Sequence, residues 1–265
     1  ILRFDGAIIC DITGQTRNDI IKYCFENSKR IYISPKISDI IIRGGTDINL
    51  FDSPLLLCRN SGLSFEQRLF KRIFDIVVSV IGLIILSPFM LIIAAAIKID
   101  DGGSIIYKQK RLTINGKEFF VYKFRSMIPN AEKNGVPQLA TGSDSRITRV
   151  GKFLRKCRLD ELPQLFNIIK GDMSVVGPRP ERPELTEKYE REMPEFKFRL
   201  KVKAGLTGYA QVTGVYDTTP YDKLKMDLMY IERYSMVMDL RIILMTIKTM
   251  ISPGEMNSEA DKEKY

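Results

Sequence analysis

The chain has 265 residues, enough for one large domain or two modest ones, and a hydrophobic content of 45% is typical of a protein with a packed core. It contains no histidine, which excludes histidine triads, histidine general bases and most zinc sites, so proton and metal chemistry falls to carboxylates, lysine or tyrosine. A net charge of +9 favours an anionic partner, whether nucleic acid, anionic lipid or a phosphorylated substrate. Four scattered cysteines without CxxC spacing indicate reduced thiols in a cytoplasmic setting.

Residues 1–62 have the pattern of part of an α/β, Rossmann-like domain. A short apolar strand is expected at Gly6–Asp11 and a helix at Thr16–Asn27. Three further apolar runs predict strands: Ile31–Ile33, Ile40–Ile42 and Leu55–Leu57. The sequence of this part has no phosphate-binding loop, so a structural or regulatory role is favoured over catalysis. Because the chain does not begin with methionine, we expect it to be a piece of a longer protein.

Residues 63–100 contain an uncharged stretch from Ile76 to Ile97. As one straight helix this stretch would be about 33 Å long, enough to cross a bilayer. Ser87 and Pro88 lie near its middle, where proline removes a backbone donor, and basic residues flank both ends, so the positive-inside rule gives no reason to place the ends on opposite sides.

A re-entrant helical hairpin and a kinked spanning helix both satisfy these observations of the apolar stretch. In the hairpin, the hydroxyl of Ser87 can help to satisfy the carbonyl groups that Pro88 leaves without a donor. A buried core helix is disfavoured, because the stretch lacks a polar face.

Residues 101–252 have the pattern of an α+β catalytic domain. Strands are expected at Ile105–Tyr107 and Phe119–Phe124, and helices at Pro163–Ile169 and Thr219–Tyr234. A final amphipathic helix at Leu240–Ile251 can lie on a membrane or pack on the apolar stretch. Residues 253–265 form a charged tail, which we expect to be frayed.

The first of three candidate clusters is in the segment 122–127. If this segment is a strand, Lys123 and Arg125 share one face of it, because side chains alternate with a period of two. Two cations on one face favour an anion site. A solvated strand face explains them equally well.

The second cluster is a pair of neighbouring carboxylates, Asp160 and Glu161. Pro163 suits the first turn of a helix, which puts both carboxylates just before a helix N-terminus, where the helix dipole and nearby arginines keep them ionised. An ionised aspartate can attack phosphorus, and an adjacent carboxylate can hold a divalent metal. Taken alone, helix capping is the favoured interpretation of this pair.

The third cluster centres on Arg179, between Pro178 and Pro180. The two prolines restrict the backbone on both sides, and an arginine presented in a fixed direction suits bidentate phosphate binding. A rigid structural turn is the alternative.

At these residues the sequence closely resembles the bacterial sugar transferase family, the monotopic polyprenyl-phosphate phosphoglycosyl transferases. Four motifs in order carry the resemblance: residues 71–99, 122–127, 158–181 and 203–214. Residues 1–62 resemble the cytoplasmic domain that precedes catalysis in longer members.

The resemblance implies roles for individual residues. Asp160 is expected to be the covalent nucleophile, with Glu161 as its partner, and the two carboxylates to hold a magnesium ion (Mg2+). Arg179 and Arg155 are expected to contact substrate phosphate. Lys123 and Arg125, from the cluster at 122–127, are expected to contact it as well. Ser87 and Pro88 match the family's helix break, which makes the membrane segment a re-entrant hairpin.

The implied reaction moves a sugar-1-phosphate from a UDP-sugar to polyprenyl (undecaprenyl) phosphate, releasing UMP, as the first step of exopolysaccharide, capsule or O-antigen synthesis. The resemblance places it at the cytoplasmic face of the bacterial inner membrane, in contact with membrane lipid, with no nucleic-acid partner; a homo-oligomer is compatible with it. Two alternatives are a membrane-anchored scaffold that binds acidic lipid and a glycosyltransferase that releases UDP. A nucleic-acid-binding protein is disfavoured, because the charges border an apolar segment.

Overall fold

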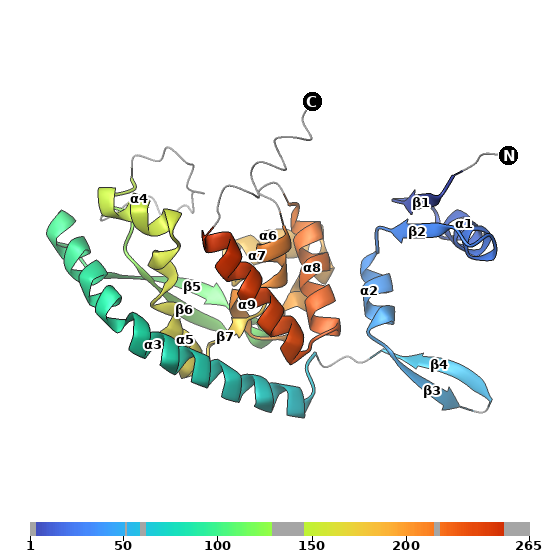
Figure 1. Ribbon diagram of the computed structural model, residues 1–265, viewed down its shortest axis with the longest axis horizontal. Helices are drawn as coiled ribbons and strands as arrows, with labels where there is room; N and C mark the ends of the chain where they lie inside the picture. The colour runs from blue at the N-terminus through green and yellow to red at the C-terminus, as the bar shows by residue number, and fades with distance from the viewer. Residues whose placement is uncertain (1–3, 51, 59–61, 129–145, 215–217, 252–265) are drawn as a thin grey trace. The chain divides into compact units, whose positions relative to one another are not determined.

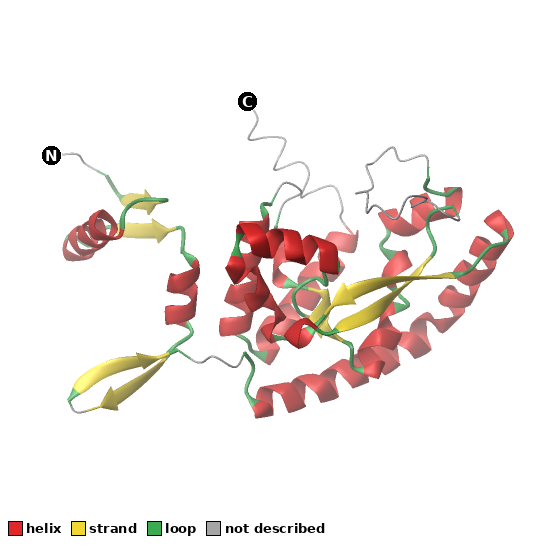
Figure 2. Cartoon of the chain, turned by 180° about the vertical axis from the view of Figure 1, so that it is seen from behind, coloured by secondary structure: helices red, strands yellow, loops and turns green. Residues whose placement is uncertain are grey.

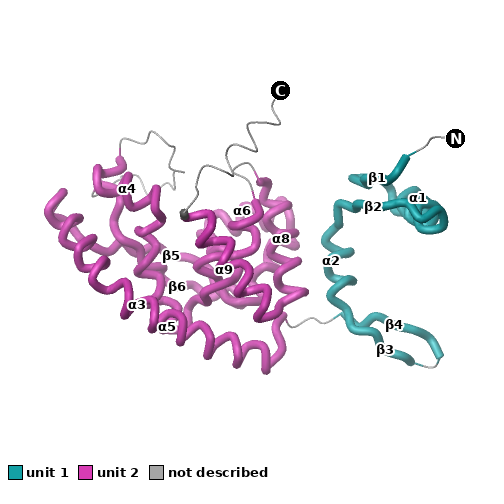
Figure 3. Tube along the Cα trace, in the orientation of Figure 1, with its two compact units in different colours: residues 1–58 teal, residues 59–265 magenta. Residues whose placement is uncertain are grey.

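The computed structural model describes residues 4–50, 52–58, 62–128, 146–214 and 218–251. The chain divides into two compact units, Ile1–Cys58 and Arg59–Tyr265, which are coloured separately in Figure 3. The charged tail expected at residues 253–265 lies outside the described residues.

The first unit begins with two parallel strands, β1 (Gly6–Ile9) and β2 (Arg30–Ile33), joined by helix α1 (Gly14–Glu26). An antiparallel hairpin of β3 (Thr46–Leu50) and β4 (Ser53–Leu57) ends the unit. The strands predicted at 31–33 and 55–57, and the helix at 16–27, are therefore confirmed.

The strand predicted at 40–42 is wrong, because this segment lies in helix α2 (Ile37–Arg43). The run of isoleucines favours a strand, but the backbone N–H of Lys36 donates to the Asp39 carboxylate at 2.8 Å. This bond satisfies an otherwise unpaired donor at the helix start. Ile40 is the buried side chain of this helix. Local capping therefore outweighs the strand propensity of the β-branched residues.

The second unit carries small two-stranded sheets among many helices (Figure 2). Its first half consists of α3 (Phe65–Asp101), the antiparallel pair β5 (Ile106–Leu112) and β6 (Glu118–Phe124), α4 (Arg149–Lys156), a 3-10 turn (Leu159–Glu161), α5 (Gln164–Lys170) and β7 (Met173–Val176). Its second half consists of α6 (Pro183–Glu192), a 3-10 helix (Pro194–Lys201), β8 (Ala204–Thr207), which pairs in parallel with β7, α7 (Tyr209–Thr213), α8 (Pro220–Glu232) and α9 (Met236–Ile251). The expected mixture of helices and strands is confirmed.

Helix α3 runs without interruption through Pro88, so the hairpin with a break at Ser87 and Pro88 is not present. Pro88 cannot donate to the carbonyl of Ile84 four residues earlier, but the Ser87 hydroxyl donates to that oxygen at 3.0 Å. The predicted use of the Ser87 hydroxyl is thus confirmed, and the bond stabilises the helix where proline removes a backbone donor. Figure 1 shows α3 as one curved helix beside α4 and α5.

One face of α3 packs on the rest of the second unit near both ends of the helix. Near its start, Lys71 forms a buried ion pair with Asp239 of α9 at 2.6 Å. Near its end, Ile93 and Ile97 belong to a core cluster with Phe124 and Leu154. Both ends of the helix are therefore fixed to the same folded unit.

Two of the three basic residues that precede the apolar stretch have a structural role. Lys71 is buried in the pair with Asp239, and Arg72 donates to the carbonyls of Ile168 and Ile169, at the end of α5, at 2.6 and 2.7 Å. These two cations tie α3 to neighbouring elements, whereas Arg68 is exposed.

The other face of α3 exposes a continuous apolar stripe. Its members recur at helical spacing: Ile73, Ile76, Val77, Val80, Ile81, Ile84, Ile85, Phe89, Leu91 and Ile92. Among the described residues, α3 is the helix that is long and apolar enough to cross a membrane. The expected membrane-type segment is therefore present, as one helix with a packed face and an exposed face.

Candidate active site

The two neighbouring carboxylates lie in a short turn between α4 and α5. Helix α4 ends at Lys156, and Arg158 adopts a left-handed conformation (φ 54°), which turns the chain into the 3-10 turn Leu159–Glu161. Leu159 packs on the core cluster beside the end of α3, and Leu162 does the same. The apolar residues on either side of Asp160 and Glu161 therefore anchor the turn to the core.

Glu161 joins three separate segments of the chain. Its Oε1 accepts from Lys123 Nζ of β6 at 2.7 Å and from Arg179 Nη2, in the loop after β7, at 2.9 Å. Burial alone would raise the pKa of Glu161, but Arg179 and Lys123 hold that pKa well below its usual range. Glu161 is therefore an ionised carboxylate that holds two cations at the site.

Asp160, next to it, has a different electrostatic environment. Burial raises the pKa of Asp160 above its ordinary value, and the negative charge of Glu161 adds to this, while Lys123 and Arg155 oppose it. The expectation that both carboxylates are strongly held in the ionised form is confirmed for Glu161, but for Asp160 the shift has the opposite sign. Neighbouring carboxylates whose pKa values are driven apart take different chemical roles.

The structure brings Lys123, Arg155 and Arg179 to the carboxylates but directs Arg125 elsewhere. Arg155 Nε donates to Ser126 Oγ at 3.0 Å, which holds the guanidinium between α4 and the end of β6. The Arg125 guanidinium lies against Gly103, just after α3. Strand β6 ends at Phe124, so the alternation that put positions 123 and 125 on one face does not extend to Arg125.

A shallow pocket opens beside Glu161. Its lining residues come from β5, β6, the 3-10 turn, α5 and the loop after β7: Arg111, Val121, Lys123, Glu161, Gln164, Arg179 and Pro180. Sequence reasoning missed Arg111, because with Lys108 and Lys110 it was assigned to the basic flank that follows the apolar stretch. The signal that identifies it is alternation, since Gln109 and Arg111 point to the more buried face of β5.

The loop that carries Arg179 rests on β8 through glycines. Gly177 N donates to Thr207 O at 2.9 Å. A Cβ at Gly205 would collide with the backbone of Gly177, and a Cβ at Gly208 would meet the Gly177 carbonyl. The glycines of the motif at 203–214 are therefore needed for the close approach of the two backbones.

The carboxylates fit a magnesium ion only if substrate phosphates and water supply most of its ligands. The described part of the chain has no group of three or more histidine, cysteine or acidic side chains that could hold a metal. One oxygen of Glu161 is already shared by two cations. Magnesium in phosphate-handling sites often takes one or two carboxylates, with substrate phosphates and water completing its shell. Asp160 and the free oxygen of Glu161 suit such an ion.

Comparison with known proteins assigns most of the second unit to one family. Residues 66–253 match the bacterial sugar transferase family. The chain is 42% identical over 185 residues to a UDP-N-acetylgalactosamine-undecaprenyl-phosphate N-acetylgalactosaminephosphotransferase of Aeromonas hydrophila, covering 69% of this chain and 44% of the relative. It is 43% identical over 211 residues to a UDP-glucose:undecaprenyl-phosphate glucose-1-phosphate transferase of Klebsiella pneumoniae, covering 78% of this chain and 43% of the relative.

A third relative is much shorter. The exopolysaccharide production protein PSS of Rhizobium leguminosarum bv. phaseoli is 40% identical over 194 residues, which cover 70% of this chain and 96% of that protein. The chain spans less than half the length of the first two relatives.

The fold and the site together define a class, a mixed helix and strand domain with one long apolar helix and a carboxylate that binds two cationic side chains. Within that class, the chain belongs to the bacterial sugar transferase family. The match begins at the start of α3 and includes every residue of the site described above.

Proposed function

We propose that the chain transfers a sugar-1-phosphate from a UDP-sugar to polyprenyl phosphate and releases UMP. The observation that carries this proposal is the arrangement at Glu161, which fixes Lys123 and Arg179 beside the less acidic Asp160. Relatives named as undecaprenyl-phosphate sugar-phosphate transferases support the substrate classes. Their names include glucose and N-acetylgalactosamine, so we propose a UDP-hexose or UDP-N-acetylhexosamine as the donor.

In the first step, an oxygen of ionised Asp160 attacks the sugar-bearing phosphorus of the UDP-sugar. The bond from that phosphorus to the bridging oxygen breaks, and UMP leaves with the electron pair. A phosphosugar ester of Asp160 remains. In the second step, a phosphate oxygen of polyprenyl phosphate attacks the same phosphorus, which frees Asp160 and yields a polyprenyl-diphosphate sugar.

The cations of the site act through charge and position. Lys123, Arg155 and Arg179 neutralise phosphate oxygens as charge moves toward the leaving group, which is the main catalytic contribution in phosphoryl transfer. Glu161, already bound to two of these cations, holds them in place. A magnesium ion held by Asp160, Glu161 and substrate would add further charge neutralisation when bound.

Helix α3 supports attachment to one side of a membrane, which we propose to be the cytoplasmic face of the bacterial plasma membrane. Because Lys71 and Ile97 fix both ends of α3 to the same unit, the helix cannot cross a bilayer without carrying that unit with it. We propose that α3 lies in one leaflet, with both ends on one side, and presents its apolar stripe to lipid. This gives the same-side topology of the expected hairpin without a break in the helix.

Identification of the released nucleotide tests the proposed function. The purified chain in lipid vesicles is incubated with a UDP-sugar and polyprenyl phosphate, and the nucleotides are separated by chromatography. UMP release is expected. UDP release would instead establish a glycosyltransferase, and the absence of any turnover would favour a scaffold.

A further inference from the structure

The loop that carries Arg179 is held through its carbonyl groups. Pro178 and Pro180 have no N–H, so these positions cannot donate hydrogen bonds. Four successive backbone carbonyls accept instead. The Pro178 carbonyl accepts from Gly205 N (2.9 Å) and the Glu181 carbonyl from Leu112 N (3.0 Å). Between them, the Arg179 carbonyl accepts from Arg199 Nη2 (3.0 Å) and the Pro180 carbonyl from Arg111 Nη1 (3.1 Å). Two of the four donors are therefore arginine side chains, and their acceptors are the carbonyl of Arg179 and the next one along the chain.

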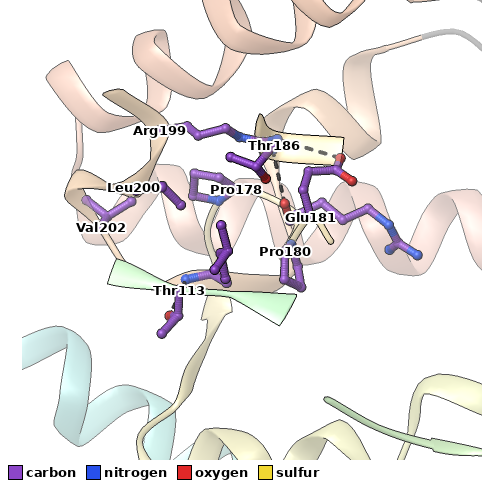
Figure 4. A pocket seen from close by; sticks show the side chains of 11 residues that line it. Thr113, Pro178, Pro180, Glu181, Thr186, Arg199, Leu200 and Val202 are labelled. Carbon is purple, nitrogen blue, oxygen red and sulfur yellow. Dashed lines mark hydrogen bonds and ion pairs between the residues drawn. The ribbon is translucent and has the colours of Figure 1, made fainter. Parts of the chain in front are cut away.

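Arg199 is immobilised by its surroundings. Its side chain is 5% exposed, and its Nη2 lies 2.8 Å from Oδ2 of the buried Asp227 of α8. Its Nη1 lies 3.6 Å from the Glu181 carboxylate, and its guanidinium carbon is 4.9 Å from the ring centre of Phe196. Figure 4 shows the end of the Arg199 side chain next to Thr186 and directed toward Glu181.

Arg111 approaches the same loop from β5. Its Nη2 donates to Gln109 Oε1 at 2.6 Å, and its Nη1 lies 3.9 Å from the second oxygen of Glu181. Arg111 and Arg199 thus share one carboxylate, Glu181, while each donates to a loop carbonyl. A guanidinium suits this task, because its planar set of N–H groups can serve a carbonyl and a carboxylate at once.

We propose that Arg199 and Arg111 are positioning residues for Arg179. The Arg179 side chain is 44% exposed, so its direction toward Glu161 depends on how firmly its own backbone is fixed. Arg199, itself held by Asp227, fixes the carbonyl of Arg179, and Arg111 fixes the next carbonyl. This inference rests on the proposed function, in which Arg179 contacts a substrate phosphate.

Loss of activity alone does not test this role, because the buried pair of Arg199 and Asp227 also contributes to folding. A double-mutant cycle with Arg179 separates the two roles, since residues that act through one another are not additive. The variants are Arg199→Lys, Arg179→Lys and the double substitution, in the full chain in lipid vesicles. The measured quantity is kcat/KM for UMP release.

In the wild-type background, Arg199→Lys is expected to lower kcat/KM by about tenfold or more, because small misplacements of catalytic groups are costly. In the Arg179→Lys background the same change is expected to cost less than about twofold, since the group to be positioned is already altered. Arg191→Lys, the same substitution at an exposed position of α6, is expected to change neither value. Equal losses in both backgrounds would overturn the positioning role.

If Arg199→Lys lowers the unfolding temperature so far that no folded protein remains, Arg111→Lys at its less buried position goes through the same cycle. Non-additivity with Arg179→Lys is expected there too, and additive losses would again contradict the proposal. A wild-type chain without UMP release would contradict the proposed function itself. An active wild-type chain with additive losses would overturn only the positioning role.

Discussion

At the residue scale, the site separates two adjacent carboxylates by their surroundings. Glu161 has two cationic partners within hydrogen-bonding distance, whereas for Asp160 burial raises the pKa, Lys123 opposes the rise and the charge of Glu161 adds to it. The carboxylate with the raised pKa is the more basic one, which suits a nucleophile, and the other suits an anchor for cations.

This assignment predicts a pH dependence for the first step. Asp160 must be ionised to attack, so the initial rate of UMP release should fall on acidification, at a higher pH than for an ordinary aspartate. Lys123 lowers the pKa of Asp160 more than any other charge does, so Lys123→Met should raise that pKa further and move the acid limb to higher pH. A pH–rate profile of single turnovers measures this shift.

Lys110→Met is the matched control, because Lys110 lies on the neighbouring strand and is exposed beside Glu118. Its acid limb should coincide with that of the wild type. An acid limb that stays in place or moves to lower pH in Lys123→Met would contradict the assignment.

Sequence reasoning found the residues of the site that lie in compact motifs, among them Lys123, Asp160 and Arg179. It missed Arg111, Arg199 and Asp227, because their function depends on contacts between segments far apart in the sequence. The alternation rule failed for Arg125, because where β6 ends is decided by tertiary packing. Which cations converge on Glu161 therefore depends on the fold.

At the element scale, α3 shows how a proline is accommodated inside a helix. The uncharged stretch predicted a membrane helix, and Pro88 near its middle predicted a break; α3 contains both Ser87 and Pro88 without a break. The sequence pattern did not predict that the helix continues, since this depends on the Ser87 hydroxyl and on packing at both ends of α3. The strand wrongly predicted at 40–42 shows a similar limit, where one capping bond outweighs the preference of isoleucine.

The Ser87 hydrogen bond predicts non-additive effects of substitutions in α3. Ser87→Ala leaves the Ile84 carbonyl without a donor and should destabilise the protein in lipid by about 1 kcal/mol. With Pro88→Ala, position 88 regains an N–H for that carbonyl, so Ser87→Ala should then have little effect. Denaturant unfolding in lipid discs measures both. The same cost of Ser87→Ala in the two backgrounds would show that the bond is not what supports the helix.

At the scale of the whole molecule, the two units differ in how far their structure could be predicted from the sequence. The parallel pair β1 and β2 was predictable from apolar runs separated by a helix, whereas the packing of α3 on α4, α5 and α9 was not, since helical spacing does not specify a partner. That packing leads to the proposal of a helix held in one leaflet.

Topology mapping tests this proposal. Cysteines are introduced at the exposed positions Arg68 and Ile99, near the two ends of α3, in a variant whose four native cysteines are replaced by serine. An impermeant thiol reagent should label both positions from the same face of membrane vesicles, and neither from the other face. Labelling of the two positions from opposite faces would establish a spanning helix.

Intact-protein mass measurement tests most directly whether Asp160 becomes covalently bound to the sugar phosphate, as we propose. The purified chain is incubated with a UDP-sugar in the absence of polyprenyl phosphate, and the modified residue is mapped by peptide fragmentation. We predict UMP release limited by the amount of enzyme and a hexose-phosphate adduct on Asp160, with both absent in Asp160→Asn. An active enzyme that forms no adduct and requires both substrates to be bound before UMP leaves would contradict the claim, because the acceptor phosphate would then attack the UDP-sugar directly.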